Sequence, residues 1–125
     1  MLAEEDIFKI VPVQGTIGYI LNYVTSEEGG THWYALYIDG RKAFIFDSLG
    51  APPDDTITKW ANENNVTLYT MTDKAQSNNS TWCGLWAIWF HYMINNGYNP
   101  QMLYKVIHQL KTYEDKEDML VSSLV

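Results

Sequence analysis

Two β-prone runs separated by a turn-forming dipeptide constrain the fold of this chain more than any other feature. They span residues 32–38 and 41–47, and Asp39-Gly40 between them is a strong signal for a type I′ hairpin. Both faces of this predicted hairpin are largely apolar. We therefore expect the hairpin to lie centrally in a sheet that is covered on both sides.

The length of the turn sets which residues of the hairpin face each other. A two-residue loop at Asp39-Gly40 places Ile38 opposite Arg41, and the same register places Trp33 opposite Phe46. The second pair would be an aromatic cross-strand contact, of the kind that stabilises sheets.

The same register brings a histidine and a carboxylate together at the end of the hairpin. His32 is predicted to face Asp47, whereas a four-residue loop would place it opposite Leu49. An aspartate beside a histidine fixes the tautomer of the ring and stabilises the imidazolium ion. The alternative is a structural hydrogen bond at a strand end, which is common for a pair considered alone.

The rest of the chain predicts further strands and helices, so the expected class is α+β. We expect a short extended segment over residues 7–13, strands over residues 17–24 and 66–71, a helix over residues 56–64, a buried helix over Cys83–Asn95 and a last helix from Pro100 onward. Asp54 or Asp55 is the expected cap of the first helix, and Asn99 that of the last. Residues 26–30, 48–53 and 72–81 should be loops, and the tail from Tyr113 is not assigned.

Composition excludes several classes of protein. A chain of 125 residues predicts one domain, residues 1–125, and no apolar run reaches the ~18 residues of a membrane span. Without a signal-peptide pattern, the expected protein is soluble and not secreted. The single cysteine excludes an internal disulfide and a multi-cysteine zinc site. The net charge of -7 argues against a nucleic-acid-binding surface.

The single cysteine, Cys83, lies where a polar run ends and the apolar helix begins. A lone buried cysteine is more often a small hydrophobic residue than a reactive one. Position favours reactivity, because the positive end of a helix dipole stabilises a thiolate in the first turn. Gly84 leaves the backbone open to a substrate, and the Cys83 N–H is a free donor that can stabilise an oxyanion.

The other histidines are weaker candidates for a base that activates this thiol. His91 lies eight residues along the same helix, about 12 Å of rise from Cys83. We expect it to form a helix-surface or core hydrogen bond. His108 falls between core positions of the last helix and should face solvent, so His32 is the default base.

These residues, in chain order, resemble a known clan of cysteine proteases. His32-Trp33, Asp47, Gln76 and Cys83-Gly84 resemble the catalytic residues of adenovirus-type maturation proteases and ubiquitin-like-protein proteases. The segments around His32 and from Gln76 to Cys83 are most similar to the adenain family. Residues 46–50 and 83–86 resemble the proteases of virophages and polintons.

The resemblance implies a compact papain-like or adenain-like domain and a role for each matched residue. It implies a central, mostly antiparallel sheet packed on the helix that carries Cys83. By this resemblance His32 is the general base, Asp47 its orienting acid, Cys83 the nucleophile and Gln76 an oxyanion donor. Without the resemblance, Gln76 would be an ordinary loop residue. The acid is aspartate where adenoviral enzymes have glutamate, a change that the wider clan accepts.

Three further residues are expected at the substrate-binding cleft. Trp33 should shield and pack beside the site, and Gly84 should leave it open. Trp82 either lines the cleft or anchors the core in front of the helix.

The implied function is a cysteine endopeptidase that cleaves viral capsid precursors during virion maturation, in the virion or a cytoplasmic virus factory. No metal or other cofactor is expected, and no membrane partner. An activating viral peptide fits the family, but not through a disulfide, because Cys83 is the only thiol. The acidic charge argues against activation by nucleic acid, and the oligomeric state is left open. The alternatives are a peptidase that removes ubiquitin-like modifiers and a non-catalytic binding domain.

Overall fold

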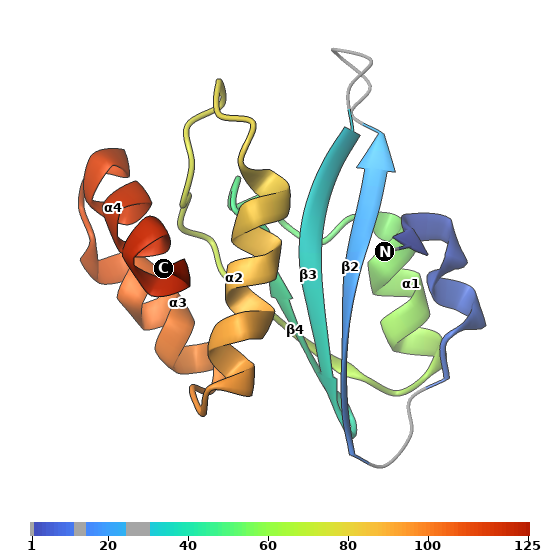
Figure 1. Cartoon of the computed structure of the whole chain (residues 1–125). Coiled ribbons are helices and arrows are strands. Elements are labelled where there is room, and N and C mark those ends of the chain that lie inside the picture. The colour runs from blue at the N-terminus through green and yellow to red at the C-terminus, as the bar shows by residue number, and fades with distance from the viewer. Residues whose placement is uncertain (1, 12–14, 25–30) are drawn as a thin grey trace.

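One mixed β-sheet with helices on both faces forms the protein (Figure 1). The computed structural model describes residues 2–11, 15–24 and 31–125. Its elements are β1 (Leu2–Ala3), the 3₁₀ helix η1 (Glu4–Lys9), β2 (Thr16–Val24), β3 (Thr31–Asp39), β4 (Lys42–Phe46), α1 (Asp55–Glu63), β5 (Thr67–Thr70), α2 (Cys83–Asn95), α3 (Pro100–Gln109) and α4 (Tyr113–Leu124).

The sheet order is β1-β2-β3-β4-β5. The β2–β3 and β3–β4 pairs are antiparallel, whereas β1–β2 and β4–β5 are parallel. The α+β class is therefore confirmed. The sheet is mixed, with the predicted antiparallel pairing at its centre and parallel pairing at its two edges. Parallel neighbours need a long connection that brings the chain back to the same end of the sheet. Such a connection contains η1 between β1 and β2, and α1 between β4 and β5.

The hairpin β3–β4 lies centrally and is covered on both sides, as its apolar faces predicted. Helix α2 packs against β3 on one face, with α3 and α4 beyond it, and α1 lies on the other face (Figure 1). Side chains alternate along β3, so Ala35 and Tyr37 pack towards α2. Tyr34 and Leu36 pack towards α1.

Helix α2 is anchored by aromatic packing, and its bounds are those predicted. Trp86, Trp89 and Phe90 are completely buried. Phe46 of β4 stacks on Phe90 with ring centroids 4.9 Å apart, and the two tryptophan rings meet edge-on at 5.4 Å. Rings of this size bury about 150–250 Å² each, so this packing fixes the helix, and its first residue, against the sheet.

The turn of the hairpin differs from the prediction. Asp39 pairs with Lys42, so Gly40 and Arg41 form the turn and Ile38 does not face Arg41. Gly40 has a φ of 59°, whereas the φ of Arg41 is not positive. A positive φ at the first central residue alone fits a type II′ turn, because type I′ requires it at both.

The register of the hairpin therefore shifts by two residues. Trp33 pairs with Asn22 of β2, and Phe46 pairs with Ala35, so the predicted Trp33–Phe46 pair is wrong. A shift of one residue would have moved every side chain to the opposite face of the sheet. A shift of two keeps each on its predicted face.

The chain before β2 is also different from the prediction. Residues 4–9 form η1 instead of an extended segment, and residues 12–14 of the expected segment lie outside the described residues. The helical turn allows Ile7 to be fully buried while Phe8 remains exposed. The loop predicted over residues 26–30 also lies outside the described residues.

Three of the described helices begin with side-chain caps, two of which were predicted. Asp54 accepts from Ile57 N at 3.1 Å, and Asn99 accepts from the Met102 N–H at 2.9 Å. The tail that was not assigned forms α4, which Thr112 caps. Such caps typically contribute about 1 kcal/mol each.

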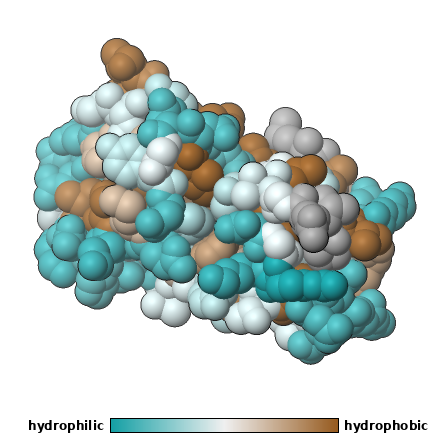
Figure 2. All heavy atoms as spheres, turned by 90° about the horizontal axis from the view of Figure 1, so that it is seen from below, coloured by the Kyte–Doolittle hydropathy of each residue, from teal (hydrophilic) through white to brown (hydrophobic). Residues whose placement is uncertain are grey.

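The surface seen in Figure 2 is largely hydrophilic, with apolar residues in separate groups. Within the described part of the chain, no helix is both long and apolar enough to cross a membrane.

Gly18 of β2 makes room for the ring of His91. A Cβ on Gly18 would lie 2.7 Å from that ring, which is held by a 2.8 Å hydrogen bond between Nε2 and the Tyr19 carbonyl. Gly18→Ala should therefore lower the free energy of unfolding by about 1–3 kcal/mol in urea titrations. In a His91→Ala background the same substitution should cost much less. Equal costs in both backgrounds would contradict the steric explanation.

Candidate active site

His32 and Asp47 form the buried pair that the sequence predicted, although by a different register. His32 lies near the start of β3, and Asp47 directly follows β4. Continued pairing would place Asp47 opposite Tyr34, which makes His32 its diagonal neighbour. Both are 4% exposed, and His32 Nε2 lies 2.7 Å from Asp47 Oδ1.

Three donors among the described residues hold the Asp47 carboxylate. Oδ1 also accepts from the Leu49 backbone N–H at 2.9 Å, and Oδ2 accepts from the Tyr23 hydroxyl at 3.5 Å. Burial, together with the charge of Asp47, raises the pKa of Tyr23, so this hydroxyl stays protonated and donates. The Tyr23 ring also packs edge-on against His32 at 5.3 Å. Both oxygens of the acid are thereby fixed.

This geometry determines the tautomer of His32. An ionised carboxylate can only accept, so the proton of the His32–Asp47 bond lies on Nε2. The other nitrogen, Nδ1, then carries the basic lone pair. It forms no hydrogen bond with any other residue that the structure describes. The pair can therefore accept a proton at Nδ1 while Asp47 stabilises the resulting imidazolium.

Cys83 is the first residue of α2, and its thiol is free and half-buried. Among the described α-helices, α2 alone lacks a side-chain cap. The first N–H groups of a helix have no partner within it, so those of Cys83 and Gly84 need one from outside. The positive end of the helix dipole also lies at this end of α2.

The start of β3 meets the start of α2 through Trp33 and Gly84. Trp33 Cδ1 lies 4.0 Å from the position that a Cβ would take on Gly84. These two residues directly follow His32 and Cys83, and both segments lie at the upper end of Figure 1. Within the described chain, no hydrogen bond joins His32 to the Cys83 thiol, so their direct pairing stays a prediction.

Gln76 is a buried residue and not an ordinary loop side chain, since only 2% of it is exposed. Its Oε1 accepts from Ser48 Oγ at 2.7 Å, and its Nε2 donates to the Ser80 carbonyl at 3.1 Å. Nε2 carries two hydrogens, and the second has no acceptor among the described residues. Ser80 lies three residues before Cys83. The amide is thus fixed beside the segment that leads into α2, and one of its Nε2 hydrogens has no acceptor among the described residues.

The residues expected at the cleft leave the start of α2 accessible. Trp82 is 37% exposed, so it is not a core anchor. Trp33 is half-buried. Apart from its chain neighbours and the backbone of its own helix, no described residue comes closer than 4.0 Å to the Cβ position of Gly84.

The other histidines are placed as expected. His91 is half-buried and bound to the Tyr19 carbonyl on β2, and burial lowers its pKa. His108 is exposed and lies 3.2 Å from Asp73. Among the described residues, neither forms a hydrogen bond with Cys83. In the described residues, no group of three or more potential ligands could hold a metal ion.

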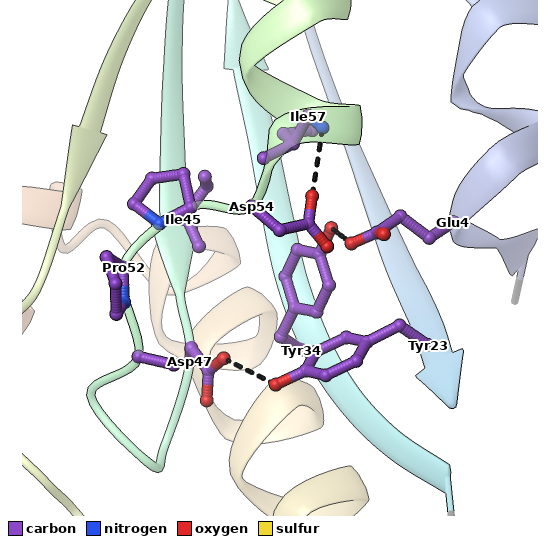
Figure 3. Close-up of a pocket in the computed structure, with 10 residues that line it drawn as sticks. Glu4, Tyr23, Tyr34, Ile45, Asp47, Pro52, Asp54 and Ile57 are labelled. Atoms are coloured by element: carbon purple, nitrogen blue, oxygen red, sulfur yellow. Dashed lines mark hydrogen bonds between the residues drawn. The ribbon is translucent and has the colours of Figure 1, made fainter. Parts of the chain in front are cut away.

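A pocket of about 230 Å³ lies on the α1 side of Asp47 (Figure 3). Its walls include Glu4, Tyr23, Tyr34 and Asp54, and Asp47 alone of the candidate residues lines it. It is therefore not a cleft above Cys83. Sequence reasoning gave no role in the site to these residues or to Ser48, because only tertiary contacts bring their side chains to it.

The carboxyl group of Glu4 in this pocket should make stability depend on pH. Burial and a hydrogen bond with Asp54 raise its pKa from 4.5 to about 7. Between these values the folded chain keeps a proton that the unfolded chain has lost. Stability must therefore fall as pH rises through this window, by up to about 3 kcal/mol.

Glu4→Gln should remove this loss. A glutamine can accept from Tyr34, as Glu4 does at 2.8 Å, and can donate to Asp54 without a proton to lose. In urea titrations the variant should match the wild type near pH 4.5 and be more stable by about 2–3 kcal/mol at pH 8. Glu5→Gln, at an exposed neighbour, is the control. Parallel pH profiles for Glu4→Gln and wild type would contradict the prediction.

Comparison with known proteins finds structural neighbours but no sequence family. No protein-family model matches the chain, and no curated protein matches it. Two crystal structures of the ASFV pS273R protease match it, one of them from the selenomethionine protein. The selenomethionine structure aligns with a TM-score of 0.62 at 19% identity, over 82% of this chain and 41% of that one. The other aligns with a TM-score of 0.59 at 18% identity, over 82% and 40%.

The chain shares the fold of this viral protease. At these identities the likeness establishes the fold alone, and the chain spans only about two fifths of the length of the protease. The α+β protease fold expected from the resemblance is therefore confirmed, but adenain in particular is not indicated.

Proposed function

We propose that the chain is a cysteine endopeptidase that cleaves viral structural precursors during virion maturation. The observation that carries the proposal is the hydrogen bond between His32 Nε2 and Asp47, which leaves Nδ1 as a base at the end of β3 nearest α2. A shared fold with a viral protease and a free thiol at the start of α2 also support it.

In the proposed reaction, His32 Nδ1 takes the proton of the Cys83 thiol, and the thiolate attacks the scissile carbonyl carbon. A carbon–sulfur bond forms, and the carbonyl oxygen becomes an oxyanion. Gln76 Nε2–H and the Cys83 N–H donate to this oxyanion. The carbon–nitrogen bond then breaks as His32 protonates the leaving amine.

The resulting thioester is hydrolysed by water. His32 Nδ1 takes a proton from the water as its oxygen attacks the thioester carbon. The carbon–sulfur bond breaks, the thiol regains the proton and the carboxylic product leaves. Asp47 stabilises the imidazolium in both halves of the reaction, while its three donors keep it from rotating.

The proposed substrates are capsid precursors, and the proposed site of action is the virion or a cytoplasmic virus factory. The open backbone at Gly84, beside Trp33, suits small residues before the scissile bond. An activating peptide would bind without a disulfide, since Cys83 is the only cysteine. The net charge of -7 disfavours DNA as an activator.

The test uses the fact that alkylation can modify only one thiol. The chain is incubated with a capsid precursor before and after treatment with iodoacetamide, and with a ubiquitin-like-modifier conjugate in parallel. We expect cleavage of the precursor by the untreated chain alone, after small residues. Equal cleavage by both forms would overturn the thiol mechanism, and cleavage of the conjugate alone would overturn the proposed substrate. No cleavage of either, with slow alkylation, would indicate a binding domain.

A further inference from the structure

Ser48, which directly follows Asp47, is tied to the segment that carries Gln76. Ser48 is 1% exposed. Its carbonyl accepts from the Ala75 N–H at 2.8 Å and the Gln76 N–H at 3.1 Å. Its hydroxyl donates to Gln76 Oε1 at 2.7 Å. The main chain of Ser48 therefore holds the backbone of Gln76, and its side chain holds the amide.

The loop that contains Ser48 is itself rigidly placed. The Gly50 N–H donates to the Asp47 carbonyl at 2.8 Å, which closes a turn. Gly50 has a φ of 67°, and a Cβ there would lie 2.8 Å from the Thr72 carbonyl oxygen. Only glycine fits this close approach without strain. The turn is thus packed against the segment that leads to Gln76.

The Gln76 amide needs both of its hydrogen bonds, to Ser48 and to Ser80, to hold its second Nε2–H in a fixed direction. The Ser80 carbonyl can only accept, so it selects the NH₂ end of the amide. The Ser48 hydroxyl satisfies the other end, Oε1. Together they fix the amide plane and leave one N–H without an acceptor among the described residues. Without the hydroxyl, the amide would be held at one end only.

We propose that Ser48 is the positioning residue for the Gln76 amide, so that the Asp47-Ser48 dipeptide orients both the base and the oxyanion donor. The side chain of Asp47 fixes His32, and the side chain of the following residue, Ser48, fixes Gln76. The inference rests on the proposed peptidase function, because only then does the spare N–H meet an oxyanion.

Ser48→Ala tests this inference, since it removes one oxygen and keeps both backbone hydrogen bonds. We expect kcat for peptide cleavage to fall about 10- to 100-fold with KM little changed, because loss of a whole oxyanion donor costs about 10²–10³-fold. The affinity for a peptide aldehyde, whose thiohemiacetal oxygen occupies the same hole, should fall in parallel. Alkylation of Cys83 by iodoacetamide involves no oxyanion, so its rate should not change.

A double-mutant cycle separates positioning from a general structural role. If Ser48 acts through Gln76, Ser48→Ala should add no further loss of kcat in a Gln76→Ala background. Additive losses, or an unchanged kcat in Ser48→Ala alone, would overturn the inference. Thermal melting checks that the Ser48→Ala protein is folded. If it is not, Ser48→Gly serves as the second variant. A wild-type chain that neither cleaves peptides nor captures the aldehyde would instead overturn the peptidase proposal.

Discussion

His32→Ala is expected to lower kcat/KM for peptide cleavage about 10⁴-fold, because the thiol then has no base to take its proton and the leaving amine has no acid. The measurement is steady-state cleavage of a peptide with a fluorescent leaving group. His108→Ala is the matched control, since His108 also lies beside an aspartate, Asp73, but is exposed on α3. It should retain full activity.

The same pair of variants tests whether His32 reaches Cys83. A histidine beside a cysteine favours the thiolate, so His32→Ala should slow alkylation of Cys83 at pH 7, whereas His108→Ala should not. Melting curves check that the buried site still folds, because His32 is 4% exposed. If His32→Ala cleaved peptides at the wild-type rate, the candidate site would be wrong. If it lost cleavage but not alkylation rate, His32 would act later than activation of the thiol.

The elements of the fold with strong local signals could be predicted from the sequence. Helix α2 is apolar nearly all round, which requires burial and fixed its bounds correctly at Cys83 and Asn95. Asn99 caps the helix that it was predicted to cap, and Asp54, one of two predicted candidates, caps α1. In each case the residues that determine the helix or its cap lie within one short stretch of the sequence.

Features that depend on contacts distant in sequence could not be predicted in the same way. The turn at Gly40 and Arg41 is set by pairing along the whole hairpin, so Asp39-Gly40 indicated a turn but not its register. The His32–Asp47 contact survived this error because the shift of two residues preserved the face. Ser48 lies in the 46–50 segment that resembles viral proteases, but its contact could not be predicted, since its partner Gln76 lies 28 residues away.

Asp47→Ala and Asp47→Asn are expected to have clearly different effects, because three donors surround this carboxylate. Alanine removes the orientation and the charge together, so kcat/KM should fall about 10³- to 10⁴-fold. An asparagine can keep the orientation. The Leu49 N–H points at the Oδ1 position and cannot rotate, so it selects the amide oxygen there. His32 Nε2 then still donates, and Nδ1 remains the base.

Asp47→Asn should therefore isolate the contribution of the negative charge. At the Oδ2 position its NH₂ group faces the Tyr23 hydroxyl, which can turn and accept. Exchanging a charged for a neutral acceptor costs about 1–2 kcal/mol, or about 5- to 30-fold in kcat/KM. Asp73→Asn, beside the exposed His108, is the matched control and should be silent. A loss in Asp47→Asn as large as in Asp47→Ala would mean that the ring had adopted the other tautomer, and that Leu49 does not determine how this residue is oriented.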